Sequence, residues 1–327
     1  MINISKRLVF STIIILFFLI QINFVFASQE NYKYLTMATG GIGGVTYQYA
    51  GATAAIASRY TDLKITAEAT GGSVENLELL KSGESDMALL MSDVYLSAYL
   101  GLKDYDARSN LRALYAGYPQ IWHLITPADS DIKSYQDIRG KRVSVGPPGS
   151  GTEFMARQIL ESLGITYDDF RVEYLSNVEM VSGLKDGILD AAFFILSYEA
   201  SAIIELDVTM GIRIIGLEDA EIDAITTKHP EYVGTVIPEG MYTAAKSDIP
   251  TVSCWNVAVA TADLPEDVAY KYVKVVMEHL DELAASLPAG KYTAVEDILL
   301  AAMSPLHPGA IKYYEEIGLT IPDHLIP

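Results

Sequence analysis

The sequence has little of what several common classes of protein depend on, and cysteine is the clearest case. Among 327 residues there is one cysteine, Cys254, which cannot form a disulfide within the chain. This excludes the small secreted scaffolds that disulfides hold together. No H-E-x-x-H pair occurs, and no cysteine stands beside a histidine, so we expect no metal site and no cofactor. The scattered histidines are His123, His229, His279, His307 and His324.

The motifs of nucleotide-binding and hydrolytic enzymes are missing as well. Gly41–Thr46 begins like the dinucleotide motif G-x-G-x-x-G, but threonine takes the place of the last glycine. No G-x-x-x-x-G-K-[ST] motif follows any apolar run. Ser150 lies between two glycines, yet Pro148 occupies the leading position of the hydrolase motif G-x-S-x-G. The sequence therefore predicts that the chain is not an enzyme.

Positive charge is scarce. The chain has 23 lysines and arginines against 42 aspartates and glutamates, which gives a formal net charge of −19. A surface this acidic repels the phosphates of nucleic acid, so we expect no nucleic-acid partner. If the ligand is an anion, donors close to it must hold it against the field of the whole protein.

The first 27 residues have the three parts of a secretory signal. Lys6 and Arg7 precede the apolar run Leu8–Ile20, and Val25-Phe26-Ala27 places small residues at the −3 and −1 positions. We expect cleavage after Ala27 and export of the mature chain. The alternative is an uncleaved anchor, because the apolar stretch is about 20 residues long and could just span a bilayer.

The mature part alternates apolar strand patterns with helical patterns, which is typical of an α/β protein. At about 300 residues it exceeds what one core usually sustains, so we expect two domains. The expected strands are Tyr34–Thr39, Leu63–Ala69, Met87–Met91, Lys141–Val145, Arg171–Leu175, Ala191–Leu196 and Ile212–Leu217. The expected helices include Tyr47–Tyr60, Val74–Ser82, Thr152–Leu163 and Val178–Gly187.

Two longer extended stretches are expected to cross between the domains. Leu111–Thr126 contains Pro119, which cannot donate to a ladder and therefore indicates a strand that leaves one sheet for another. Ser253–Ala260 is the expected return crossing. We place one lobe at residues 28–118 plus 255–327 and the other at 119–254. A helix over Pro265–Ala285 and a helical tail over Val295–Leu319 are expected to complete the first lobe.

Three glycine-rich turns follow expected strands and precede expected helices: Met37–Tyr47, Gly71–Asn76 and Gly149–Thr152. Such a turn leaves backbone N–H groups and the positive end of the helix dipole free to hold an anion. The alternative is that each turn is merely tight. Ser92-Asp93 ends a third strand at the same edge, either as part of the site or as the cap of a helix over Val94–Leu100.

The carboxyl ends of parallel strands meet at one edge of a sheet, so these turns predict a cleft between the lobes. Tyr118 is expected at its floor, and Phe194 and Ser197 are expected either on its wall or in the core. The candidate ligand contacts are Gly43, Gly44, Val45, Thr46, Tyr47, Ser73, Asn76, Ser92, Tyr118, Gln120, Ser150, Gly151, Thr152, Phe194 and Ser197.

Several motifs that occur in order along the whole mature chain resemble the TAXI family, the substrate-binding proteins of tripartite ATP-independent periplasmic (TRAP) transporters. They are Ala38–Tyr47, Ala69–Leu80, Ser92-Asp93, Arg142–Thr152, Asp190–Phe194 and Pro305–Gly309. The resemblance implies a monomeric periplasmic protein with a type II-like periplasmic-binding-protein fold, two Rossmann-like lobes joined by two hinge strands. It implies capture of glutamate, a related amino acid or a dicarboxylate such as 2-oxoglutarate, and delivery to a sodium-driven permease.

One position departs from the family pattern. Where many relatives have Tyr-Pro-Glu, this chain has Tyr118-Pro119-Gln120, so a neutral amide replaces a carboxylate. If Gln120 contacts the ligand, the change favours an anion over an ammonium group. Two other functions stay open: a sensor that feeds a receptor kinase, and a secreted hydrolase or transferase. The enzyme would need a base beside its nucleophile, and no histidine lies in the three glycine-rich turns.

Overall fold

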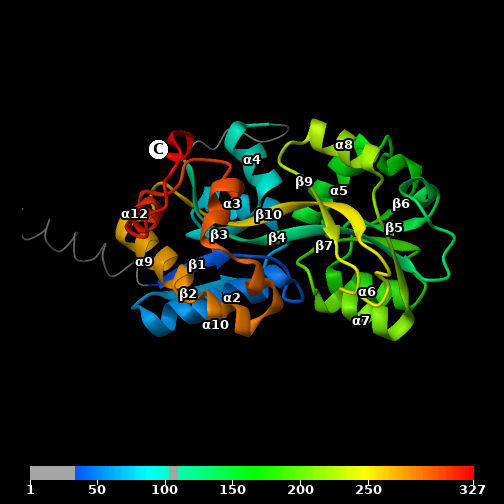
Figure 1. Ribbon diagram of the computed structural model, residues 1–327, viewed down its shortest axis with the longest axis horizontal. Coiled ribbons are helices and arrows are strands. Elements are labelled where there is room, and N and C mark those ends of the chain that lie inside the picture. Colours follow the sequence, from blue (N-terminus) through cyan, green and yellow to red (C-terminus); the bar gives the residue numbers. More distant parts are fainter. Residues whose placement is uncertain (1–33, 103–109) are drawn as a thin grey trace, which may run out of the picture.

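Two long strands run through the middle of the molecule and carry the rest of the sheet. In the computed structural model, which describes residues 34–102 and 110–327, these are β4 (Leu111–Pro127) and β10 (Ile249–Thr261). Figure 1 shows them passing from the half that holds both ends of the described chain into the other half. The expected signal peptide and its cleavage site lie outside the described residues.

The described strands form one ten-stranded sheet in the order β2-β1-β3-β10-β4-β7-β5-β6, with β8 paired to β4 and β9 to β10. The remaining strands are β1 (Tyr34–Ala38), β2 (Lys64–Glu68), β3 (Met87–Met91), β5 (Arg142–Ser144), β6 (Arg171–Glu173), β7 (Ala191–Leu196), β8 (Ile212–Ile215) and β9 (Val233–Ile237). β1, β2 and β3 are mutually parallel, as are β5, β6 and β7. Strands β3 and β7 are buried along their whole length, in keeping with their unbroken apolar sequences.

Helices cover both faces of the sheet in each half (Figure 1). They are α2 (Val45–Tyr60), α3 (Ser73–Ser82), α4 (Ser92–Leu100), α5 (Gly151–Ser162), α6 (Asn177–Lys185), α7 (Ser201–Met210), α8 (Asp219–Lys228), α9 (Glu266–Met277), α10 (Leu280–Ser286), α11 (Ile298–Ala301) and α12 (Pro308–Glu316). We call β1–β3 with α2–α4 and α9–α12 the first lobe, and β5–β9 with α5–α8 the second lobe. Within the described residues, no helix is long and apolar enough to cross a membrane.

Each lobe has its own apolar core. One buried cluster is drawn from residues between Leu35 and Tyr118 and between Val257 and Leu325. Two further clusters are drawn from residues between Ile121 and Cys254, and Met91 of β3 joins one of them. The chain therefore leaves the first core along β4 and returns to it along β10.

Both predicted crossings are present, but the prediction of two separate sheets was wrong. β4 and β10 pair with each other from Leu111–Thr261 at one end to Ile121–Ser253 at the other, which makes the two sheets continuous. Pro119 lies in the middle of β4, and the register shifts beside it, between Trp255 and Val257. A bulge bends and twists a strand, so the irregularity lies where the sheet passes between lobes.

The predicted helix Pro265–Ala285 is two helices in the structure. α9 ends at Met277, and α10 begins at Leu280 after His279, whose backbone is not helical (φ −125°, ψ 33°). The ring of His279 donates from Nδ1 to the carbonyl oxygen of Val275 at 2.7 Å and stacks on Tyr60. The imidazole thus takes up one of the carbonyls that the end of a helix leaves without a partner.

Candidate ligand-binding site

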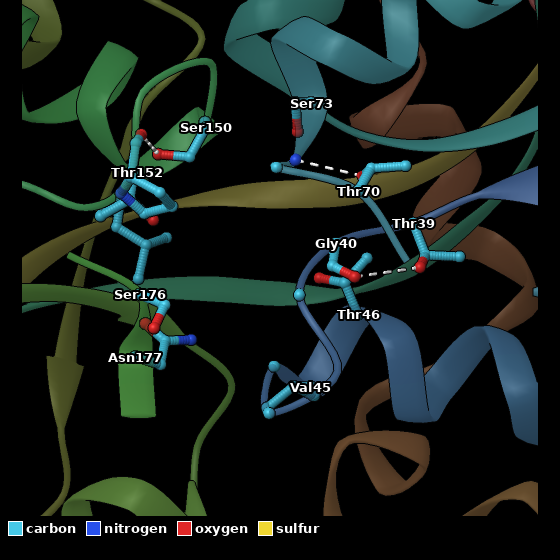
Figure 2. Close-up of a pocket in the computed structure, with 18 of the residues that line it drawn as sticks. Thr39, Gly40, Val45, Thr46, Thr70, Ser73, Ser150, Thr152, Ser176 and Asn177 are labelled. Atoms are coloured by element: carbon cyan, nitrogen blue, oxygen red, sulfur yellow. Dashed lines mark hydrogen bonds between the residues drawn. The ribbon is translucent and has the colours of Figure 1, made fainter. Parts of the chain in front are cut away.

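A cavity of about 310 Å³ lies between the lobes, where the turns after the parallel strands face one another. Figure 2 shows Thr39, Thr46, Thr70 and Ser73 of the first lobe on one side of it. Ser150, Thr152, Ser176 and Asn177 of the second lobe lie on the other side. The volume is at the lower end of the range for small-molecule sites, about 300–1,000 Å³.

The first glycine-rich turn connects β1 to α2. Gly44 is the N-cap of α2 and has an extended backbone, and no side chain caps this end of the helix. The first turn of the helix contains no acidic residue. The N–H of Gly44 donates to the carbonyl oxygen of Gly41 at 2.7 Å, which closes the turn. The first N–H groups of a helix have no partner inside the helix, so Val45 and Thr46 bring unused donors to the cavity wall.

The second turn, between β2 and α3, touches the second lobe. Gly72 has φ +125°, a conformation that L side chains rarely adopt, and a Cβ there would lie 3.2 Å from Ser150 Cα. The hydroxyl of Thr70 accepts from the N–H of Gly72 at 3.1 Å and donates to Asn76 Oδ1 at 2.6 Å. Glycine is required here because the two lobes approach at backbone distance.

The third turn precedes α5 and is capped by its own side chains. Ser150 Oγ accepts from the N–H of Glu153 at 3.1 Å and donates to the carbonyl oxygen of Pro147 at 2.6 Å. Glu153 lies in the first turn of the helix and forms an ion pair with Arg157 at 2.5 Å. The N-terminus of α5 therefore already has a side-chain cap and a negative charge.

A fourth turn, between β6 and α6, completes the wall. Ser176 and Glu179 form a capping box: Ser176 Oγ accepts from the N–H of Glu179, and Glu179 Oε2 accepts from the N–H of Ser176 at 2.8 Å. Hydrogen bonding from Ser176 lowers the pKa of Glu179, so its charge is held at the helix start. Val178 reaches across the cleft to Gly43, where an added Cβ would lie 2.6 Å from Val178 Cγ2.

Gln120 of β4 lies at the hinge side of the cavity and is 4% exposed. Within the part of the chain that the structure describes, its carboxamide has no hydrogen-bond partner. Beneath it, Tyr118 is fully buried, and burial raises its pKa. The Tyr118 hydroxyl lies 3.0 Å from Thr46 Oγ1 and so supports the cavity wall from behind.

The lobes meet directly around the cavity. The N–H of Glu75 donates to the carbonyl oxygen of Gly149 at 3.3 Å, from one turn to the opposite one. On another side, Lys291 Nζ lies 2.9 Å from Glu199 Oε2. The structure therefore has the lobes in a closed arrangement.

Among residues 34–102 and 110–327, no side chain that lines the cavity carries a charge: hydroxyls, amides, backbone and apolar groups make its wall. Among the residues that the structure describes, no group of three or more histidine, cysteine or acidic side chains is arranged to hold a metal ion. The wall can offer an incoming molecule hydrogen bonds and helix dipoles, and it can offer apolar contact.

Nine of the predicted contacts come together on the wall: Gly43, Gly44, Val45, Thr46, Ser73, Gln120, Ser150, Gly151 and Thr152. Six others do not line this cavity: Tyr47, Asn76, Ser92, Tyr118, Phe194 and Ser197.

The positions of five of these, all but Tyr47, follow from their hydrogen bonds and packing. Asn76 is buried and donates to the carbonyl oxygens of Thr39 (2.7 Å) and Leu89 (2.9 Å), so it ties α3 to two strand ends. Phe194 lies in the core of the second lobe, and Ser197 donates to the carbonyl oxygen of Tyr198.

Ser92 is also buried, and the prediction that Ser92-Asp93 caps a later helix was wrong. α4 begins at Ser92 itself, after Met91 as N-cap. The hydroxyl of Ser92 accepts from the N–H of Trp255 at 3.1 Å, because the first turn of α4 packs on β10. Asp93 is fully buried and accepts from the hydroxyl of Tyr232 at 2.7 Å, a contact between the lobes.

Sequence reasoning missed the fourth turn and the apolar part of the wall. The signal for the turn was present: Ser176 followed by Glu179 is a capping box directly after a strand. Lining residues that were not among the predicted contacts, some of them within the predicted turns, are Thr39, Gly40, Gly41, Ile42, Thr70, Gly71, Gly72, Met91, Pro147, Ser176, Asn177, Val178, Ile195 and Leu196.

Solved structures similar to this chain are known. A protein of Bordetella bronchiseptica RB50 is 16% identical, with a TM-score of 0.53 over 89% of this chain and 91% of that chain. PhnD1 of Prochlorococcus marinus, solved in complex with methylphosphonate, is 11% identical, with a TM-score of 0.53 over 80% and 91%. The periplasmic aliphatic sulphonate binding protein SsuA of Escherichia coli is 13% identical, with a TM-score of 0.45 over 87% and 83%.

At sequence identities this low, structural similarity establishes a shared fold and no shared function. The predicted two-lobe fold of periplasmic binding proteins is thereby confirmed. The model of the NMT1-like family matches residues 37–318, from the first strand to the last helix. This chain belongs to the NMT1-like family.

Proposed function

We propose that the chain is the extracytoplasmic solute-binding protein of a transporter and that it captures a small organic anion between its lobes. Its place in the NMT1-like family and its two-lobe fold support a binding role. We further propose that the transporter is a TRAP transporter of the TAXI type and that the ligand is delivered to a sodium-coupled permease. This proposal is based on the sequence motifs described above, which occur in the same order as in the TAXI family. Glutamate, a related amino acid or a dicarboxylate such as 2-oxoglutarate is the class that this resemblance implies.

The N-terminus of α2 carries the proposal. This helix start lies at the cavity wall, no side chain caps it, and the first turn of the helix contains no acidic residue. An anion there is stabilised by the helix dipole and by N–H groups that have no other partner. Charge-assisted hydrogen bonds contribute roughly 1.5–3 kcal/mol each when their geometry is good. Such a seat needs no lysine or arginine, which fits the uncharged wall.

Capture follows from the two-lobe arrangement. We propose that residues 28–118 with 255–327 move as one lobe and residues 119–254 as the other, with β4 and β10 as the hinge. The separate apolar cores support this division. A ligand that touches Thr46 and Ser73 on one side and Thr152 on the other binds the closed form better. It therefore shifts the population toward that form, which a membrane partner can recognise.

Binding without reaction is favoured by the chemistry of the wall. A serine nucleophile needs a base within hydrogen-bond reach, and the lining residues include no histidine and no acidic side chain. Ser150 is engaged with Pro147 and Glu153, so its hydroxyl serves the helix cap. We propose a periplasmic protein that acts as a monomer after removal of its signal peptide.

Thermal unfolding in the presence of a ligand panel tests the binding role. Carboxylates, dicarboxylates, amino acids and sugars are added at millimolar concentration to the mature protein, and product formation is followed by NMR. We expect acidic compounds to raise the melting temperature and to remain unchanged. A response to sugars alone contradicts the anion proposal, and turnover of a bound compound contradicts the binding-only role.

The transporter type needs a separate test. The mature protein is added to vesicles that contain the permease from the same genome, and uptake of a radiolabelled anion is measured with a sodium gradient or with ATP. We expect uptake to depend on sodium. Uptake driven by ATP contradicts the TRAP proposal and leaves the solute-binding role in place.

A further inference from the structure

Among the described residues, five helices begin at the cavity, and their starts are not equivalent. α4, whose N-cap Met91 lines the wall, has Asp93 in its first turn. α5 and α6 each have a serine cap and a glutamate in the first turn, Glu153 and Glu179. α3 has no side-chain cap, but Glu75 lies in its first turn and accepts from the N–H of Gly71 at 2.7 Å. α2 has neither a cap nor an acid. Among the described residues, the start of α2 is therefore the one helix start at this cavity that has neither an acidic residue in its first turn nor a side-chain cap.

Gln120 supplies an independent indication of a ligand. Its side chain is more than nine-tenths buried, it lines the cavity, and it has no hydrogen-bond partner among the described residues. The NH₂ group of this amide can donate to an oxygen of a ligand in the cavity. The amide carries no charge, so it can assist an anion and cannot neutralise a cation.

An ammonium group has no suitable partner in this cavity. Among the described residues no carboxylate lines it, and the nearby Glu75, which is exposed, already accepts from the N–H of the lining residue Gly71 at 2.7 Å. Two carbonyls of the first turn already accept hydrogen bonds: Gly40 accepts from the N–H of Thr70 at 3.3 Å, and Gly41 accepts from the N–H of Gly44 at 2.7 Å. Burying an ammonium ion without a counter-charge and acceptors is strongly unfavourable.

The second lobe adds apolar side chains to its side of the cavity, next to Thr152, Asn177 and two serines, Ser150 and Ser176, whose hydroxyls are used in helix caps. Pro147, Val178, Ile195 and Leu196 line that side of the cavity. A second negative charge placed there would face the helix starts that already hold Glu153 and Glu179. The first-lobe side of the cavity thus suits the anionic end of a ligand, and the second-lobe side suits an uncharged end.

From this asymmetry we infer that the ligand is a singly charged oxyanion, a carboxylate or sulfonate, with no ammonium group and with an uncharged, mostly apolar remainder. The acidic group lies on the N-terminus of α2 within reach of Gln120, and the remainder lies against Val178, Ile195 and Leu196. The inference rests on the proposed capture of an anion. It departs from the class that the family resemblance implies, because amino acids carry an ammonium group and dicarboxylates carry a second negative charge.

Calorimetry with pairs of compounds that differ in one group tests each part. Butyrate is compared with 2-aminobutyrate, and propanesulfonate with 3-aminopropanesulfonate, for the ammonium group. Pentanoate is compared with glutarate for the second charge. We expect the singly charged, amino-free member of each pair to bind at least about tenfold more tightly. Equal or tighter binding of an amino compound, or of glutarate, overturns the inference.

The variant Gln120→Glu tests the position of the anion, with Gln120→Met as its matched uncharged control. We expect Gln120→Glu to weaken butyrate binding at least about tenfold more than Gln120→Met does, because it adds a like charge beside the seat. An equal effect of the two substitutions overturns the placement. If Gln120→Glu does not fold, as judged by its melting curve, the comparison of ligand pairs on the natural chain decides the inference alone.

These outcomes separate the two levels of the proposal. Binding of sugars with no binding of any carboxylate or sulfonate contradicts the anion-capture function itself. Tight binding of amino acids or dicarboxylates preserves that function and overturns the narrower inference.

Discussion

Substitution of Gly43 by alanine should weaken ligand binding without weakening the fold. Gly43 is exposed on the turn before α2, and an added Cβ would lie 2.6 Å from Val178 Cγ2 of the other lobe. Carbon atoms in contact prefer about 3.5–4.0 Å. The clash exists when the lobes are closed and disappears when they separate, so it acts on closure alone.

The magnitude follows from the cost of overpacking, about 1–3 kcal/mol for an inserted methyl group. Val178 is 61% exposed and can move partly away, which places the expected cost near the lower end. A cost of about 1 kcal/mol in the closed form reduces the affinity about fivefold, and about 3 kcal/mol reduces it about 150-fold.

The assay is calorimetry with the carboxylate that raises the melting temperature most, on four variants. Gly41→Ala is the matched control, because nothing lies within 4 Å of a Cβ at that position of the same turn. Gly43→Ala combined with Val178→Ala should bind about as tightly as Val178→Ala alone, which is the reference because Val178 itself lines the cavity, since the clashing methyl group is removed. Full affinity in Gly43→Ala, or clearly weaker binding by the double variant than by Val178→Ala, refutes the reasoning about closure.

Two further predictions concern buried polar groups. Burial lowers the pKa of His123 to about 4, so the native state excludes a proton that the unfolded state binds below its ordinary pKa of about 6.5. The free energy of unfolding therefore falls as the pH falls from 6.5 to 4, by up to about 3 kcal/mol for this group. Urea unfolding at pH 7 and pH 4.5 should show a smaller fall in His123→Phe than in the natural chain. An equal fall in the two proteins contradicts the assignment to His123. Asn76→Ala removes two hydrogen bonds that join α3 to Thr39 after β1 and Leu89 of β3, and a third from Thr70 in the turn after β2, so we expect a loss of about 2–4 kcal/mol in urea unfolding. Asn177→Ala, on the cavity wall, is the control that should change ligand affinity with little change in stability, and equal destabilisation by both contradicts the distinction.

Much of the fold could be predicted from local patterns. The apolar runs of β3 and β7 are long enough and pure enough to indicate buried parallel strands, and Pro119 indicated the crossing. The continuity of the sheet could not be predicted. It depends on pairing between β4 and β10, whose residues are more than a hundred positions apart, and no local pattern reports such a pairing.

The cavity wall could be predicted in part for a similar reason. A glycine-rich turn after a strand places its backbone at the sheet edge, which located Gly43, Gly44 and Gly151. It does not say which way a neighbouring side chain points. Asn76 and Tyr118 are close in sequence to residues that line the cavity, yet the side chains of both point into the protein and hydrogen-bond to residues of the wall. The direction of a side chain depends on the packing of the whole lobe.

A crystal structure of the mature protein with a bound carboxylate, such as butyrate, tests the central claim most directly. The account predicts a carboxylate oxygen about 2.7–3.2 Å from the backbone nitrogen of Val45 or Thr46 at the start of α2, with the lobes closed around it. A carboxylate seated instead at the start of α5 or α6, or outside the cleft, would contradict the account.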